Sequence, residues 1–148
     1  MKRLFHCHLI LLLIVTGCQF NSRQMEESFL RTVDSFYAAV DSGNQEDHAN
    51  LFSNDAILMP DDWTISRGEA VKESVINRTG WVFRIKDLNR LEYGISKDIG
   101  YTVNEYYYTW HAEGSQLKWH KTKNVHIWRL QDDNTWKLQV DIWNHTPK

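Results

Sequence analysis

The chain has 148 residues, enough for one domain, and its hydrophobic content of 42% and charged content of 24% are ordinary for a globular protein. Its net charge of −2 and its lack of clustered Lys and Arg argue against nucleic-acid binding. Aromatic residues make up 13% of the chain and include seven tryptophans, so we expect large rings to fill a core or line a cavity.

The first 17 residues have the organisation of a secretory leader. A basic start, Met1-Lys2-Arg3, precedes a mostly apolar stretch from Leu4 to Val15. A membrane-spanning helix needs about 20 apolar residues, and this stretch is shorter and interrupted by His6 and His8. We therefore expect a cleaved leader rather than a membrane span.

The end of this leader resembles the lipobox of bacterial lipoproteins, in which a cysteine after a small residue is acylated and becomes the new N-terminus. The matching residues are Val15-Thr16-Gly17-Cys18. The resemblance implies a lipoprotein signal peptide over residues 1–17, lipidation of Cys18 and a short tether over residues 18–24. An ordinary signal peptide or a helical anchor, with an incidental cysteine, is the alternative.

The lipoprotein resemblance also implies a location. Several acyl chains together anchor a protein stably to a membrane, so Cys18 would hold the mature protein in a bacterial cell envelope. Gln19 is not the Asp that retains lipoproteins in the inner membrane, which implies the outer membrane, facing the periplasm, in an organism that has one. Cys7 lies in the leader, so no disulfide is expected in the mature chain.

Helical patterns come first in the mature chain. Apolar residues recur at threes and fours from Met25 to Val40, and Ser42-Gly43-Asn44 ends this amphipathic run. A short helix is expected from Gln45 to Phe52. After it, Ser53-Asn54-Asp55 is expected to turn into a strand from Ala56 to Met59, which Pro60 ends. A third helix is expected from Ser66-Arg67-Gly68 through Asn77, ended by Thr79-Gly80.

The second half of the chain has the pattern of an antiparallel meander. Short polar turns at Lys97-Asp98, Glu113-Gly114-Ser115 and Asp132-Asp133-Asn134 separate long strand-like runs. The expected strands are Leu88 to Ser96, Ile99 to Ala112, Gln116 to Leu130 and Thr135 to Asn144. Helices followed by strands predict an α+β fold with the helices on one face of a curved sheet.

Cross-strand pairing predicts which residues share a face of this sheet. A turn at Glu113-Gly114-Ser115 sets Glu105 opposite Lys123, Val103 opposite Val125 and Tyr101 opposite Ile127, so opposite charges meet and apolar groups meet. The next hairpin is expected to place Val125 beside Val140 and Ile127 beside Leu138. We expect this face to be concave and covered by the helices.

The opposite face is polar and strongly aromatic, as a partly wet protein interface would be. We expect it to be an outer, dimer-forming face or a surface that stacks sugars or peptidoglycan. A one-residue bulge would exchange the two faces and make this set the pocket lining. Its candidate residues are Tyr106, Tyr108, Trp110, His126, Trp128, Asp141 and Trp143.

The order of these elements resembles the nuclear-transport-factor-2-like (NTF2-like) superfamily, which includes SnoaL-like cyclases and ketosteroid isomerases. The motifs that carry the resemblance are Phe36-Tyr37-Ala38-Ala39-Val40 with Ser42-Gly43-Asn44, Leu51-Phe52 with Asp55-Ala56, Arg67-Gly68 with Ala70-Val71, and Trp136-Lys137-Leu138 leading to Asp141-Ile142-Trp143-Asn144. The resemblance implies a cone-shaped (cystatin-like) α+β domain over residues 25–148. Its sheet would wrap around the first helix, with a pocket between them.

The resemblance also gives positions at which to look for catalytic groups. In the isomerase branch a Tyr on the first helix polarises a carbonyl and an Asp at the end of the first strand moves the proton. Here these positions hold Phe36 and Pro60. Asp61 and Asp62 follow and could either approach the pocket mouth or form a solvated loop. The pocket candidates are Tyr37, Trp63, Tyr101, Glu105, Tyr107, Lys123 and Asn144.

These observations predict a lipid-anchored envelope protein that binds a small, largely apolar molecule or acts as a dimeric interaction module. The alternative is a cofactor-free lyase, isomerase or hydrolase of the SnoaL or ketosteroid-isomerase type. We expect no cofactor and no metal site, because the mature chain contains no HExxH, paired-Cys or GxSxG pattern. The expected partners are a membrane, a small ligand and a second copy of the chain, and no nucleic acid.

Overall fold

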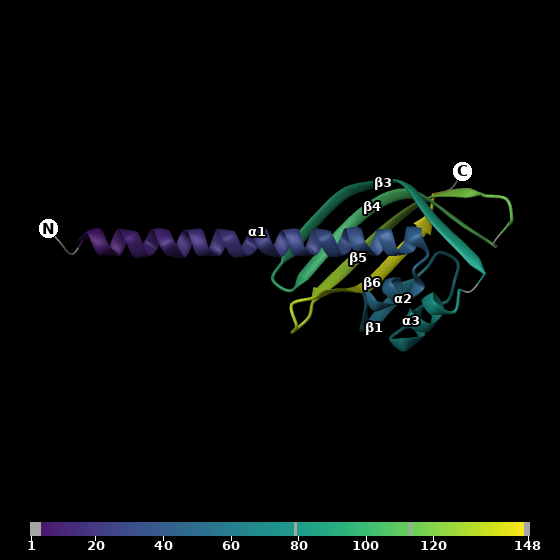
Figure 1. The fold of residues 1–148 in the computed structure, drawn as a ribbon, viewed down its shortest axis with the longest axis horizontal. Coiled ribbons are helices and arrows are strands. Elements are labelled where there is room, and N and C mark those ends of the chain that lie inside the picture. Colours follow the sequence, from purple (N-terminus) through teal and green to yellow (C-terminus); the bar gives the residue numbers. More distant parts are fainter. Residues whose placement is uncertain (1–3, 79, 113, 147–148) are drawn as a thin grey trace.

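The computed structural model describes residues 4–78, 80–112 and 114–146, with side chains from residue 22 onward. Four long strands arch over the C-terminal half of the first helix, and the two shorter helices lie beside the first strand (Figure 1). The elements in chain order are α1 (Leu4–Ser42), α2 (Gln45–Asn50), β1 (Phe52–Met59), β2 (Ser66–Arg67), α3 (Glu69–Ile76), β3 (Trp81–Ser96), β4 (Ile99–Ala112), β5 (Trp119–Leu130) and β6 (Trp136–His145).

Helix α1 supplies the central rod of the domain. The predicted apolar stripe is confirmed, because Phe29, Val33 and Phe36 are all buried against the sheet. Gly43 ends the helix with φ of 72°, and its amide donates to the carbonyl of Val40 at 3.2 Å. Toward the N-terminus the helix continues to Leu4 and projects away from the sheet (Figure 1).

The segment that contains the expected leader and the expected lipidation site can be described only in part. The helix runs without a break through residues 18–24, which were expected to form a tether. The side chains of Cys7 and Cys18 and the basic residues at positions 1–3 lie outside the described part. Within the described residues, no helix has both the length and the apolar character that crossing a bilayer requires.

The six strands form one sheet in the order β2-β1-β6-β5-β4-β3. β1 runs parallel to β6, and every other neighbouring pair is antiparallel. The sheet is therefore mixed, whereas the meander alone predicted an antiparallel one. β3 is 16 residues long and has two register irregularities, between Lys86 and Asn89 and between Arg90 and Glu92, which help it to bend around α1.

Several boundaries differ from the sequence-based expectation because tertiary pairing overrides local propensity. Phe52 belongs to β1 and not to the second helix, and Ser53-Asn54-Asp55 continue that strand instead of forming a turn. The cause is β6, whose Leu138 amide donates to the carbonyl of Leu51 at 2.8 Å. β3 begins at Trp81, seven residues before Leu88, because Trp81 to Lys86 pair with the far end of β4. Thr79 and Glu113, expected in turns, lie outside the described residues.

The predicted register of β4 and β5 is confirmed, but the predicted concave face is wrong. Glu105 pairs with Lys123, Val103 with Val125 and Tyr101 with Ile127, as expected. However, the side chains covered by α1 belong to the other face, on which Thr102, Asn104, His126 and Trp128 are fully buried. The polar and aromatic face is therefore the concave one.

Contacts with α1 show why this face is covered. The Phe36 ring lies edge-on to His126 and to Trp128, with ring centroids 4.9 and 5.9 Å away. The Tyr37 ring stacks on His126 at 5.8 Å. Val103 and Val125, expected in the core, are only half-buried on the convex side.

A bulge in β6 explains the rest of the rearrangement. Ile127 pairs with Val140, but the next residue, Trp128, pairs with Leu138, which leaves Gln139 as the extra residue. Trp136 and Leu138 therefore lie in the core, as expected, whereas Val140 and Ile142 lie on the convex side. Val125 pairs with Ile142 rather than with the predicted Val140.

The core depends on close contact between α1 and the sheet. Phe29 is fully buried, and its ring lies 6.3 Å from that of Trp128 and 5.0 Å from that of Trp136. Gly100 leaves room for it, because a Cβ atom at that position would come within 2.5 Å of the Phe29 ring. Phe29 therefore lies near the turn between β3 and β4, where α1 enters the domain.

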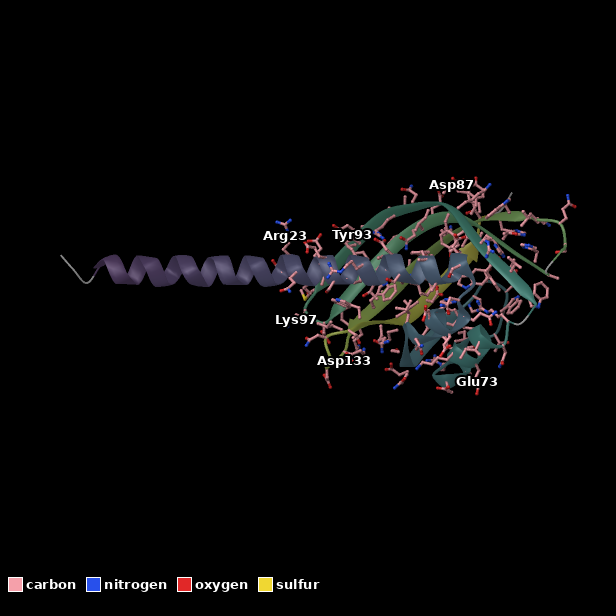
Figure 2. All side chains as sticks on the ribbon, in the orientation of Figure 1. Arg23, Glu73, Asp87, Tyr93, Lys97 and Asp133 are labelled. Carbon is pink, nitrogen blue, oxygen red and sulfur yellow. The ribbon has the colours of Figure 1, made fainter. Side chains whose placement is uncertain are left out.

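Charged side chains cover the outside of the domain. Glu73, Asp87, Lys97 and Asp133 project outward around its edge (Figure 2). Tyr93 of β3, which pairs with Thr102 of β4, donates a hydrogen bond from its hydroxyl to Glu26 Oε1 at 2.6 Å. This contact ties the edge of the sheet to α1.

Candidate functional site

A cavity of about 520 Å³ lies inside the cone. This volume is in the range of typical small-molecule sites. All three helices and all six strands contribute to its wall, and the lining is dominated by aromatic and imidazole rings. The lining includes Phe36, His48, Pro60, Asp61, Trp63, Arg78, Trp81, Phe83, Tyr106, Tyr108, Trp110, His120, Thr122, His126, Asp141, Trp143 and His145.

Exposed tryptophans form one side of the cavity. Trp63, Trp81 and Trp110 line it and are 63%, 45% and 36% exposed. The Trp110 ring lies 4.7 Å from that of Trp81 and 5.3 Å from that of Trp63. Because these rings meet both solvent and cavity, we define them as the aromatic mouth.

The floor of the cavity is a buried polar network on β5 and β6. His126 is fully buried, with 0% of its surface accessible to solvent, and its Nε2 atom lies 3.2 Å from Asp141 Oδ1. The same Nε2 lies 2.7 Å from the amide nitrogen of Asn124. Asn124 in turn bonds to the Tyr37 hydroxyl and accepts from the side chain of Asn104 at 3.0 Å. A histidine held next to a carboxylate in this way can hold or transfer a proton.

Buried tyrosines add hydroxyl groups to this network. Burial raises the pKa of Tyr37 above its ordinary value and raises that of Tyr106 well above it. Burial, and secondarily the negative charge of Asp61, raises the pKa of Tyr108 to about 12. All three phenols are therefore protonated at neutral pH and can donate hydrogen bonds.

A second polar region lies where α2 and the end of α3 meet the cavity. His48 is 8% exposed, and burial, followed by the charges of Arg78 and His126, lowers its pKa to about 3. Arg78 follows α3, and its Nε donates to the carbonyl of Ser74 at 2.9 Å. The neutral imidazole and the guanidinium both line the cavity.

Most of the expected pocket candidates lie outside the cavity. Trp63 is at its mouth, and Tyr37 is buried behind its wall. The other five lie on the convex side of the sheet, because the predicted face was the wrong one. Tyr101 is hydrogen-bonded to Glu92, and Glu105 forms an ion pair with Lys121 at 2.9 Å rather than with Lys123. Tyr107, Lys123 and Asn144 are exposed.

The alternative set, by contrast, faces the helices. Tyr106, Tyr108, Trp110, His126, Asp141 and Trp143 line the cavity, and Trp128 lies in the core beside it. This is the arrangement expected for the alternative in which the two faces of the sheet are exchanged and this set lines the pocket. These side chains do not form an outer surface, so the expectation that they provide the dimer face is wrong.

The two isomerase positions also lie in the cavity wall. Phe36 and Pro60 line it, and neither side chain can accept or donate a proton. Asp61 lines it as well, with a carboxylate oxygen that accepts from the backbone amide of His145 at 2.9 Å. Asp62 is exposed. The isomerase pair of Tyr and Asp is therefore absent at these positions.

Sequence reasoning missed several residues of the site. Arg78 and His48 gave no signal, because a charged or polar residue near a helix end is usually solvated. Thr122 was not among the candidate residues, yet it is fully buried in the cavity wall. Its position two residues from Asn124 and four from His126 on one strand was the available signal.

Comparison with known proteins identifies the fold. No protein-family model matches the sequence, and a comparison with curated protein sequences finds no match. Among solved structures, a ketosteroid isomerase-like protein from Erwinia carotovora atroseptica has a TM-score of 0.72 at 10% identity, over 82% of this chain and 96% of that one. A proposed dehydratase of the NTF2-like family from Streptomyces avermitilis has a TM-score of 0.67 at 14% identity, over 85% and 99%.

A third solved structure has the same architecture. It is an NTF2-like protein with a cystatin-like fold from Novosphingobium aromaticivorans, with a TM-score of 0.67 at 12% identity over 86% of both chains. Identities this low establish the fold and leave the chemistry to the site itself. The chain has the cone-shaped α+β fold of the NTF2-like superfamily, as its sequence motifs implied.

Proposed function

We propose that this protein is a lipid-anchored envelope protein whose cone binds a small, largely apolar molecule. The observation that carries the proposal is the cavity of about 520 Å³, with its aromatic walls and a few convergent polar groups. The ring-lined walls favour a flat or branched apolar body. The anchor rests on the lipobox-like sequence at Cys18.

Unpartnered polar atoms support a ligand in this cavity. Within the described residues, Thr122 Oγ1, His126 Nδ1 and His145 Nδ1 are buried without a hydrogen-bond partner. A buried polar group without a partner costs about 1–3 kcal/mol. A ligand with one or two polar groups would satisfy some of these atoms.

The position of the mouth is consistent with an anchored binding protein. α1 enters beside the turn between β3 and β4, whereas Asp41, near its end, accepts from the backbone amide of Ile85 at 2.9 Å. The mouth residues Trp81 and Trp110 lie at the start of β3 and near the end of β4, which pair with each other. These strand ends lie far from the N-terminal part of α1 (Figure 1). A ligand would therefore enter on the side away from the anchored terminus.

Filling the cavity should block binding. We expect Thr122→Phe to weaken the affinity for the uncharged dye methyl anthracene-9-carboxylate by about tenfold or more, since a ring would occupy ligand volume. The measurement is a fluorescence anisotropy titration of a chain that begins at residue 19. This chain retains the whole described core, whose first packed residue is Met25.

Val125→Phe is the matched control for this experiment. It adds a ring to the same strand, three residues away, on the convex face. The control should bind the dye as the unmodified protein does. Equal affinities of the Thr122→Phe and unmodified proteins, with both folded by circular dichroism, would place binding elsewhere.

The His126–Asp141 pair favours a second candidate, a cofactor-free lyase, isomerase or hydrolase. The imidazole and carboxylate are buried together, 3.2 Å apart, next to protonated tyrosines, which is a suitable arrangement for proton transfer. Mass spectrometry of the natural ligand after incubation separates the two candidates. Recovery of unchanged ligand supports binding alone, whereas conversion that His126→Gln abolishes supports catalysis.

Homodimerisation also remains a proposal, now on the convex face of the sheet. Val103, Val125, Ile127 and Val140 are half-buried there, and Ile142 is 41% exposed. A contiguous apolar surface of this kind favours association. These aliphatic residues, which were expected in the core, would then be covered by a second copy of the chain.

A further inference from the structure

The guanidinium of Arg78 lies in the wall of the cavity and is positioned by two contacts. Its Nε donates to the carbonyl of Ser74, one turn earlier, at 2.9 Å. Its central carbon lies 4.8 Å from the centroid of the Phe83 ring, so the planar group also rests against an aromatic face. These two contacts orient the guanidinium before any ligand arrives.

The charge of Arg78 is not neutralised by a neighbouring side chain. Arg23, Arg90 and Lys121 each form an ion pair with a carboxylate. Among the residues that the structure describes, none forms an ion pair with Arg78. Burial lowers the pKa of Arg78, and the more distant Asp141 opposes that shift. A guanidinium stays charged in proteins, so a partly desolvated one without a carboxylate calls for an anionic partner.

His48 provides a second contact at the same place. It lines the cavity with Arg78, and the two also share the wall of a smaller adjoining hollow. Its buried Nε2 atom has no hydrogen-bond partner within the described residues. A neutral imidazole that carries its proton on Nε2 can donate to one oxygen of a carboxylate while a guanidinium holds the other.

The acidic side chains of the cavity set the direction of such a ligand. Asp61 and Asp141 come from the loop after β1 and from β6, whereas His48 comes from α2 and Arg78 from the segment that follows α3. An anion is attracted to Arg78 and repelled by the two carboxylates. The apolar body would then lie along the rings of Tyr106, Tyr108 and Trp110.

We propose that the ligand is an amphipathic carboxylic acid whose carboxylate binds Arg78 and His48 and whose apolar body fills the aromatic part of the cavity. This inference rests on the proposed small-molecule site and specifies its ligand class. It adds a charged binding group to a cavity whose ring-lined walls alone would suggest a purely apolar ligand.

A pair of dyes that differ in charge and by one methyl group tests the proposal. Anthracene-9-carboxylate and its methyl ester are titrated by fluorescence anisotropy into the chain that begins at residue 19. The carboxylate should bind about tenfold more tightly than the ester, since hydrogen bonds between charged groups are the stronger ones. Arg78→Gln should remove this preference by weakening the carboxylate alone, and Arg78→Lys should retain part of it.

Arg67→Gln is the matched control, because it removes the same charge from an exposed residue that does not line the cavity. It should leave both affinities unchanged. Equal binding of the two dyes by the unmodified protein, or equal weakening of both by Arg78→Gln, would overturn the carboxylate proposal while leaving the cavity proposal intact. Binding of neither dye would contradict both proposals.

Discussion

Cys18→Ser is expected to abolish lipid attachment completely. The hydroxyl of serine cannot take the place of the thiol that lipoprotein processing acylates, so the precursor should keep its leader and incorporate no lipid. Expression in a bacterial host with an alkyne-labelled palmitate analogue measures this outcome. The labelled band of the unmodified protein should disappear in the variant, and the chain should migrate at the size of the precursor.

Cys7→Ser is the control for this experiment, since it replaces the chain's other cysteine within the leader. It should be labelled and processed like the unmodified protein. Persistent labelling of the Cys18→Ser variant would reject the lipid anchor. Normal cleavage of that variant without labelling would instead indicate an ordinary signal peptide.

Phe29→Ala is expected to lower the free energy of unfolding of the domain by a large amount. Removing this fully buried ring leaves a cavity between α1 and the sheet, beside Trp128 and Trp136. Phe to Ala changes in cores cost about 3–5 kcal/mol, a large part of the stability of an ordinary domain. Urea unfolding of the chain that begins at residue 19, followed by tryptophan fluorescence, measures the difference in free energy of unfolding.

Leu91→Ala serves as the control for this measurement. Leu91 lies on β3 and is 57% exposed, and surface substitutions usually change stability by no more than about 0.5 kcal/mol. A loss in Phe29→Ala no larger than that of the control would mean that α1 does not pack as the structure describes.

Local patterns in the sequence were sufficient for much of the fold. The spacing of apolar residues predicted the helix from Met25 to Val40, since a 3.6-residue period places them on one face whatever they contact. Polar turns separated the four long strands from one another, although β3 begins earlier than expected, and charge and apolar pairing set the register of β4 against β5. The motif order also implied the cone that the solved structures share.

Local patterns could not determine which face of the sheet is concave. A strand's two-residue period sorts side chains into two sets but does not say which set a distant helix will cover. Here the aliphatic set is convex, and the polar, aromatic set is concave. The usual association of aliphatic residues with the core failed because part of the inside of this cone, beside the packed core, is a cavity lined by rings and polar groups.

The site itself depends on contacts between residues far apart in the chain. The bulge at Gln139 brings Asp141 to the same face as His126, and no turn residue or alternation break announces it. Arg78 and His48 enter the cavity only because α2 and α3 pack over its edge. The sequence by itself determined most of the elements, their order and one hairpin register, because these follow from neighbouring residues. The tertiary structure decided the concave face, the His126–Asp141 pair and the charged wall, because these follow from how the helices and sheet close on one another.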